Sequence, residues 1–192
     1  MGAAPNVSHY PRGTRVLGVD PNAAFAARAA EAADAAGVEL ELVNATAESL
    51  PFASASADVV VSTFCLCSVR SPHAVLAEAA RVLRPGGRLL LLEHVSAAAG
   101  TPLARKQRAL DPLQQALAGN CHLTRRTGAL LAELSASVAC TGEAFACEPD
   151  EVPSAPDAPG GAHPFKACEV AGFFVPGGDL IAPHVTAAAV RA

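Results

Sequence analysis

The stretch "RVLGVD" at residues 15–20 joins a short apolar run to a closing carboxylate. The run predicts a buried strand. In parallel sheets, ligands bind where strands end at their carboxyl ends. Asp20 therefore stands where a nucleotide-binding α/β domain holds a ribose, because a carboxylate there can accept both hydroxyl groups. The alternative is that Asp20 only caps the helix that follows it.

Strand and helix patterns alternate outward from this stretch. Further strands are predicted at 38–43, 57–69, 88–95 and 184–190, and helices at 22–37, 71–87, 102–119 and 123–137. This order predicts an α/β fold with a doubly wound, mostly parallel sheet and helices on both faces. The strand at 57–69 is apolar for so long that it suits a central position, covered on both faces.

A single domain is expected over residues 1–192, since this length supports one substantial core but not two. Within that domain, residues 148–180 begin with a run rich in Pro, Gly, Asp and Ser. Such a composition predicts a flexible insertion.

Composition narrows the classes of partner. The formal net charge is −4, and the chain has no Trp and one Tyr. Neither a broad phosphate-binding surface nor a stacking platform for nucleic acid is therefore expected, and a small molecule is the favoured partner. No apolar run of about 18 residues and no secretory signal is visible. We accordingly expect no membrane segment and a cytoplasmic location.

The six cysteines show no paired spacing typical of a zinc site, so no metal is expected. Reduced thiols are the default for a cytoplasmic chain. Cys65 and Cys67 are two residues apart on a predicted strand and would share a face. We interpret them as buried free thiols, because no further metal ligand sits at a suitable spacing.

Five motifs in order carry a family resemblance. They are "GVDPN" (18–22), "AESLPF" (47–52), "ADVVVSTFCLCSV" (57–69), "RVLRPGGRLLLLEH" (81–94) and "GNCHLTR" (119–125). Together they resemble the class I S-adenosylmethionine-dependent methyltransferases, over residues 2–147 and 183–191. "CSV" (67–69) and "LDPLQQALAGNCHLTR" (110–125) are similar to the small group whose animal members methylate alkyl thiols.

The resemblance implies a Rossmann-like fold, S-adenosylmethionine as cofactor, and a thiol or other lipophilic small molecule as acceptor. It places Asp20 at the cofactor ribose. The remaining cofactor-side positions that it implies are Thr46, Ala47 and Glu48 beside the adenine, and Phe64 and Cys65 beside the methionine part.

Three residues match the substrate side. His94 is either a general base or a structural hydrogen-bonding group. Cys121 and His122 either contact the acceptor or simply join two helices. Direct transfer mainly requires alignment of the nucleophile and exclusion of water, so no catalytic triad or metal need be present.

The segment "GAAPN" (2–6) resembles the tail of the family's glycine-rich cofactor loop, with Gly2 at its middle glycine. The resemblance thus implies an N-terminally truncated chain whose sheet lacks its first strand and whose cofactor affinity is reduced. It also implies that the full-length parent is anchored at an intracellular membrane surface.

Other functions remain open beside thiol methylation. One is a quinone or phenol methyltransferase, and another is a catalytically impaired fragment or pseudoenzyme that lacks the glycine-rich loop. A dinucleotide oxidoreductase is disfavoured, because no intact Gly-x-Gly-x-x-Gly is present.

Overall fold

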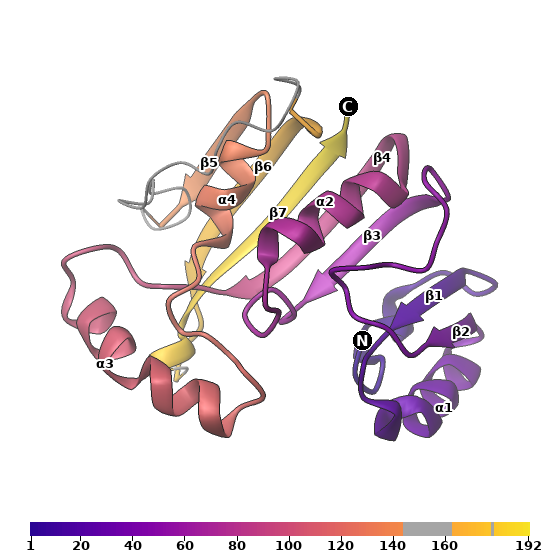
Figure 1. The fold of residues 1–192 in the computed structure, drawn as a ribbon, viewed down its shortest axis with the longest axis horizontal. Helices are drawn as coiled ribbons and strands as arrows, with labels where there is room; N and C mark the ends of the chain where they lie inside the picture. The colour runs from indigo at the N-terminus through magenta and orange to yellow at the C-terminus, as the bar shows by residue number, and fades with distance from the viewer. Residues whose placement is uncertain (144–162, 178) are drawn as a thin grey trace. The chain divides into compact units, whose positions relative to one another are not determined.

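A computed structural model describes residues 1–143, 163–177 and 179–192. The chain divides into two compact units, residues 1–51 and 52–192, and Figure 1 shows their elements as ribbons. The single domain expected over 1–192 stays a prediction.

The first unit is a two-stranded parallel sheet with one α-helix and two 3₁₀ helices. Its elements are η1 (Pro5–His9), β1 (Arg15–Val19), η2 (Ala23–Phe25), α1 (Ala26–Ala36) and β2 (Glu39–Val43). The predicted helical region at 22–37 is present, but its first turn is the 3₁₀ helix η2 and the α-helix begins at Ala26. The Asn22 side chain accepts a hydrogen bond from the Ala24 amide at 3.0 Å, and Gly37 ends α1 in the left-handed region at φ 68°.

The second unit is built on a five-stranded sheet. Its elements are β3 (Ala57–Thr63), α2 (Pro72–Val82), β4 (Leu83–His94), α3 (Pro102–Leu117), α4 (Thr127–Glu133), β5 (Val138–Gly142), β6 (Phe165–Phe174), η4 (Asp179–Ile181) and β7 (Pro183–Arg191). The strand order is β3-β4-β7-β6-β5. The pairs β3–β4 and β5–β6 are parallel, and β7 runs antiparallel to both of its neighbours. The predicted α/β, mostly parallel fold class is confirmed.

Several boundaries differ from the prediction: β4 begins at Leu83 rather than at residue 88, and α4 covers Thr127–Glu133 rather than 123–137. β3 ends at Thr63 rather than residue 69, because Phe64 has a φ of 50° and leaves the extended conformation. α2 ends at Val82, and the chain is extended at Leu83. The following Arg84 precedes a proline, and such a residue disfavours the helical conformation.

Part of the expected flexible insertion at 148–180 is regular structure. Residues 144–162 and 178 lie outside the described residues, but Phe165–Phe174 forms β6 between β5 and β7. The prediction applied the Pro- and Gly-rich composition of the first residues to the whole range and therefore missed this strand. The segment "FKACEVAGFF" (165–174) places buried side chains at alternating positions over much of its length, as a strand does.

The five-stranded sheet is covered unevenly. α2 and α4 both lie in front of it in Figure 1. Leu89 and Leu91 on β4 are buried, whereas Leu90 between them is 38% exposed. Val59 and Val61 share one face of β3 and are 47% and 41% exposed. The expectation that 57–69 is covered on both faces is therefore wrong.

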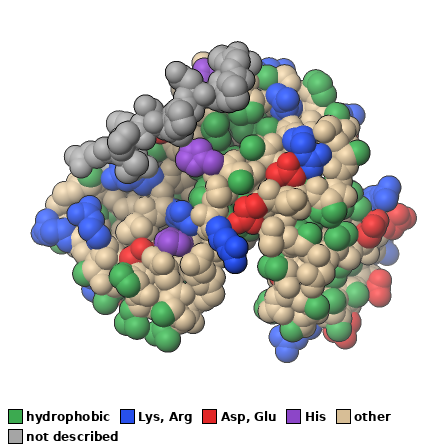
Figure 2. All heavy atoms as spheres, viewed as in Figure 1, with side chains coloured by type: hydrophobic (Ala, Val, Ile, Leu, Met, Phe, Trp, Pro, Cys, Tyr) green, Lys and Arg blue, Asp and Glu red, His purple; other side chains and the backbone are tan. Residues whose placement is uncertain are grey.

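The surface mixes charge signs and also carries exposed apolar residues. Figure 2 shows basic and acidic side chains interspersed on the visible face, with hydrophobic side chains gathered over the end of α3. Leu113 and Leu117 of α3 are 56% and 78% exposed. In the described ranges, no helix combines the length and apolarity needed to span a bilayer. The cytoplasmic location and the absence of a nucleic-acid partner stay predictions.

The thiols are mostly as expected. Cys65, Cys67, Cys121 and Cys168 are free. Cys140 is disulfide-bonded, so the expectation of reduced thiols is wrong at that position.

Replacement of Phe165 tests the placement of β6. Phe165 is fully buried and Phe174, on the same strand, is 47% exposed. Phe165→Ala should lower the free energy of unfolding by about 3–5 kcal/mol, because it leaves a cavity. Phe174→Ala should cost less than about 1 kcal/mol. Urea unfolding of the two variants compares them, and equal losses would contradict the assignment.

Candidate functional site

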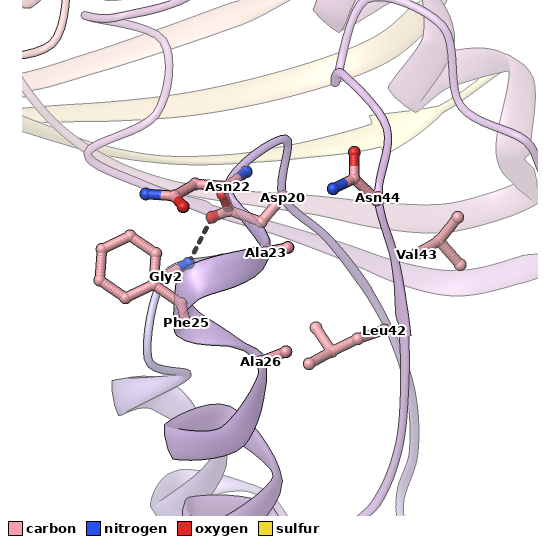
Figure 3. Close-up of a pocket in the computed structure, with 9 residues that line it drawn as sticks. All are labelled: Gly2, Asp20, Asn22, Ala23, Phe25, Ala26, Leu42, Val43 and Asn44. Atoms are coloured by element: carbon pink, nitrogen blue, oxygen red, sulfur yellow. Dashed lines mark hydrogen bonds between the residues drawn. The ribbon is translucent and has the colours of Figure 1, made fainter.

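A pocket of about 100 Å³ lies at the carboxyl ends of β1 and β2 in the first unit. Figure 3 shows its lining: Gly2, Asp20, Asn22, Ala23, Phe25, Ala26, Leu42, Val43 and Asn44. Pockets that enclose a whole small ligand usually span about 300–1,000 Å³. This one can therefore surround only part of a nucleoside-sized molecule.

Asp20 is the charged group of this pocket. The Gly2 amide donates to its Oδ2 at 2.7 Å, as Figure 3 shows, and the Asn22 amide donates to its Oδ1 at 2.8 Å. The Met1 amine also contacts Oδ2 at 2.9 Å. Burial would raise the pKa of the Asp20 carboxyl, but these hydrogen bonds outweigh it and leave the pKa below its ordinary value. Asp20 is thus an ionised acceptor at neutral pH.

Two of the residues expected to bind the cofactor line the same pocket, and three others of the first unit do not line it. Gly2 and Asp20 share the pocket. Thr46, Ala47 and Glu48 follow β2 in a turn that the Ser49 amide closes on the Thr46 carbonyl at 3.2 Å. None of these three lines the pocket, so their contact with an adenine stays a prediction.

In the second unit, Glu93 fixes the turn that follows β3. Its Oε1 accepts hydrogen bonds from the Ser62 hydroxyl at 2.9 Å, the Cys65 amide at 3.0 Å and the Leu66 amide at 3.1 Å. Glu93 is fully buried, and burial raises its pKa although these bonds oppose the shift. Sequence reasoning placed Glu93 at the strand end but missed this role. The available signal was a lone acid closing the apolar run "RLLLL" (88–92).

The same turn carries Phe64, Cys65 and Cys67. Cys65 and Cys67 lie beyond the end of β3, so the interpretation that they share a strand face is wrong. Cys67 is buried, but Cys65 is only partly buried. The ring of Phe64 lies 5.5 Å from that of His184 and 6.4 Å from that of His94. Contacts of Phe64 and Cys65 with a cofactor stay predictions.

The segment between α3 and α4 docks on this turn. Its residues donate to three consecutive carbonyl groups: the Asn120 side chain to Ser68 at 2.8 Å, the His122 amide to Cys67 at 2.8 Å, and the Arg125 guanidinium to Val69 at 2.6 Å. The motifs "CSV" (67–69) and "GNCHLTR" (119–125), far apart in the sequence, thus lie side by side. This docking places Cys121 against the end of β4.

Docking assembles a buried cluster of Cys67, His94 and Cys121. One donor atom from each lies within 4.8 Å of the others, and His94 Nε2 is 3.1 Å from Cys121 Sγ. Two residues of metal-ligand type thus lie near Cys67 although the sequence spacing did not indicate them, and the expectation that no metal binds stays a prediction. Cys65 and His122 do not belong to the cluster.

Burial is the main cause of the pKa shifts of His94 and Cys67 in this cluster. Burial, with a smaller contribution from His184, lowers the pKa of His94 to about 4. Burial raises the pKa of the Cys67 thiol to about 12. Each group is accordingly neutral near pH 7. So low a pKa makes the His94 imidazole a weak general base, and its catalytic role stays a prediction.

His122 faces a different partner. Its Nδ1 lies 3.7 Å from Asp111 Oδ2, and the Asp111 carboxylate also accepts a bond from the Leu123 amide. Asp111 therefore supports the docked segment from the α3 side. A contact of Cys121 or His122 with an acceptor stays a prediction, and the helix-joining alternative describes the observed bonds of His122.

Comparisons with known proteins agree on one family. Residues 1–91 match the family model of the methyltransferase domain. Thiol S-methyltransferase TMT1B of Rattus norvegicus is 41% identical over 129 residues, which are 66% of this chain and 53% of that protein. Thiol S-methyltransferase TMT1A of Homo sapiens is 38% identical over 139 residues, or 71% of this chain and 57% of that protein. The chain spans about half the length of these curated relatives.

A solved structure shares the fold. It is an S-adenosylmethionine-dependent methyltransferase of Thermotoga maritima, described as a possible histamine N-methyltransferase. The TM-score is 0.58 with 17% sequence identity, over 100% of this chain and 90% of that chain. At this identity, the likeness supports the Rossmann-like fold class and nothing finer.

Variants of Glu93 test its hold on the turn. Glu93→Ala removes the carboxylate that the Cys65 and Leu66 amides donate to, and a buried donor left unsatisfied costs about 1–3 kcal/mol. We expect a loss of more than about 2 kcal/mol in the free energy of unfolding. Glu93→Gln keeps an acceptor oxygen and should cost less than about 1.5 kcal/mol.

Urea unfolding gives both values, with Glu133→Ala on the exposed end of α4 as the control. If the Ala and Gln variants lose equal stability, the hydrogen bonds to Oε1 do not hold the turn.

Proposed function

We propose, because the chain belongs to the class I S-adenosylmethionine-dependent methyltransferase family, that it transfers a methyl group to a small-molecule thiol. The observation that carries the proposal is the Asp20 carboxylate at the carboxyl end of β1, paired with the Gly2 amide in one pocket. Strand ends of this kind are where open α/β sheets bind nucleotides.

The residues of the pocket fit the ribose of S-adenosylmethionine. A carboxylate offers about four acceptor positions, and three N–H donors contact Asp20 here. A position therefore remains for a ribose hydroxyl. Phe25 and Leu42 supply apolar walls on either side, as Figure 3 shows. A pocket of this size would hold the ribose, and other residues would contact the rest of the cofactor.

The cofactor supplies an activated sulfonium methyl group when it is bound. The residues of the chain then have three tasks: to bind the ribose through Asp20, to orient the acceptor sulfur, and to exclude water. No strong protein base is required, because a thiol with a modestly lowered pKa provides enough thiolate. The low pKa of His94 is compatible with this mechanism.

Two observations support a thiol as the acceptor. The relatives TMT1B and TMT1A are named thiol S-methyltransferases. The two motifs that carry the resemblance to that group, residues 67–69 and 110–125, are also held together by hydrogen bonds in the second unit. No observation favours a quinone or phenol over a thiol.

Asp20→Asn tests the cofactor pocket. The substitution removes the charge that a ribose hydroxyl would contact, and hydrogen bonds to charged groups are worth about 1.5–3 kcal/mol. Affinity for S-adenosylmethionine, measured by isothermal titration of the full chain, should fall about 10- to 100-fold. Asp34→Asn, on the exposed face of α1, is the matched control and should bind like the unmodified chain.

Equal affinities of the Asp20 and Asp34 variants would overturn the assignment of the pocket. If the unmodified chain binds no S-adenosylmethionine, the impaired-fragment alternative is supported instead of the proposal.

A panel of acceptors tests the reaction. The full chain is incubated with methyl-labelled S-adenosylmethionine and an alkyl thiol, a phenol or a hydroquinone. We expect label in the thiol product, with a rate that rises with pH as the thiolate fraction rises. Asp20→Asn measures the background. Label in the phenol or hydroquinone alone would replace the thiol proposal with that alternative.

A further inference from the structure

We propose that Cys67, His94 and Cys121 bind a metal ion, and that Zn²⁺ is the ion their donor atoms fit best. The site lies wholly in the second unit, at the carboxyl ends of β3 and β4. It goes beyond the proposed function, because transfer of a sulfonium methyl group does not itself need a metal.

The donors come from three segments that other bonds hold in place. Cys67 lies in the turn fixed by Glu93, which contacts the neighbouring Leu66 amide. His94 ends β4, which pairs with β3 on one side and β7 on the other. Cys121 lies in the docked segment, whose hydrogen bonds are formed by the residues on either side of it. The arrangement therefore exists before an ion binds.

The distances suit a tetrahedral ion. Zinc binds sulfur at about 2.3 Å and imidazole nitrogen at about 2.0 Å, so its ligand atoms lie about 3.5–3.8 Å apart. The three donor atoms here lie within 4.8 Å of one another, with His94 Nε2 3.1 Å from Cys121 Sγ. Small movements of the side chains would bring all three donor atoms to bonding distance of one ion.

The chemistry of the donor atoms and their burial both favour zinc. Two thiolates and one neutral imidazole are a zinc donor set, and softer ligands select against Mg²⁺ and Ca²⁺. Cys67, His94 and Cys121 are 3%, 4% and 9% exposed. Two thiolates balance the charge of a divalent cation, so the filled site is neutral and burial carries little penalty.

Further groups contact the sulfur atoms, as is usual around bound metals. The Gln114 side-chain amide donates to Cys121 Sγ at 3.7 Å. The Ser68 hydroxyl lies 3.4 Å from Cys67 Sγ. Hydrogen bonds of this kind orient the sulfur atoms.

Three protein donors leave a fourth position on a tetrahedral ion. Zinc sites that take an exogenous ligand have this composition, whereas structural sites use four protein donors. An acceptor thiol fits the position: its sulfur would bond to the ion and its proton would pass to solvent, with no change of oxidation state. This last step rests on the proposed function, and the metal site does not.

Titration of the reduced, full-length chain with Co²⁺ tests the site. Tetrahedral Co²⁺ with thiolate ligands has intense absorption bands in the near-ultraviolet and visible range, and Zn²⁺ displaces it. We expect one equivalent to bind with these bands. Cys67→Ser and Cys121→Ser should each weaken binding by more than about 100-fold, since even residues outside the ligand set cost 10- to 100-fold. Cys168→Ser, a buried free cysteine on β6, is the matched control and should bind normally.

Absence of the thiolate bands in the unmodified chain would overturn the proposal, and this outcome does not depend on how the variants fold. Equal loss in Cys168→Ser and Cys67→Ser would overturn it too. A thermal midpoint that Zn²⁺ raises in the unmodified chain and in Cys168→Ser, but not in Cys67→Ser, supports it. An alkyl thiol that shifts the Co²⁺ bands supports occupation of the fourth position. Metal binding without any methyl transfer would leave the site standing and refute only the proposed function.

Discussion

The candidate site of the second unit depends on one buried carboxyl group. Glu93 follows four leucines near the end of β4, and its Oε1 accepts hydrogen bonds from the Ser62 hydroxyl and from the Cys65 and Leu66 amides. A carboxyl group is costly to bury, and these bonds offset part of the cost. They also force the chain out of β3 and into a turn. Without that turn, the carbonyl groups of 67–69 would not face the segment from 119–125.

The hydrogen bonds that dock residues 119–125 join residues that are far apart in the sequence. Asn120 reaches a residue 52 positions earlier in the chain, and Arg125 reaches one 56 positions earlier. Both contacts depend on the pairing of β3 with β4, because Glu93 near the end of β4 fixes the turn. Residues on the two sides share one network, so substitutions in 67–69 and 119–125 should not act independently of each other.

Local patterns in the sequence predicted local structure well. Asn22 and Gly37 mark the ends of the first helical region because capping depends on the residue itself and its nearest neighbours. The spacing between Gly2 and Asp20 predicted that they meet, and they share a hydrogen bond. Only one 3₁₀ helix and one strand separate them along the chain, so few alternative arrangements exist.

Features that depend on distant contacts were missed. β3 was drawn too long because its apolar pattern continues to Val69, while the left-handed Phe64 is set by Glu93 across the sheet. β6 was overlooked because its partners, β5 and β7, lie on opposite sides of it in the sheet and in the chain. The cysteine–histidine cluster was invisible for the same reason: His94 and Cys121 are 27 residues apart.

The free edge of β3 has a consequence for the behaviour of the protein in solution. Among the described residues, β3 pairs as a strand with β4 alone, so it is an edge strand of the five-stranded sheet, and its Val59 and Val61 are exposed. Edges of this kind invite pairing with a strand of another molecule, and natural proteins guard them with charges or prolines. Asp58 is the one charged residue of β3, and the strand contains no proline. This strand is therefore the place in the sheet where pairing with a second molecule would begin.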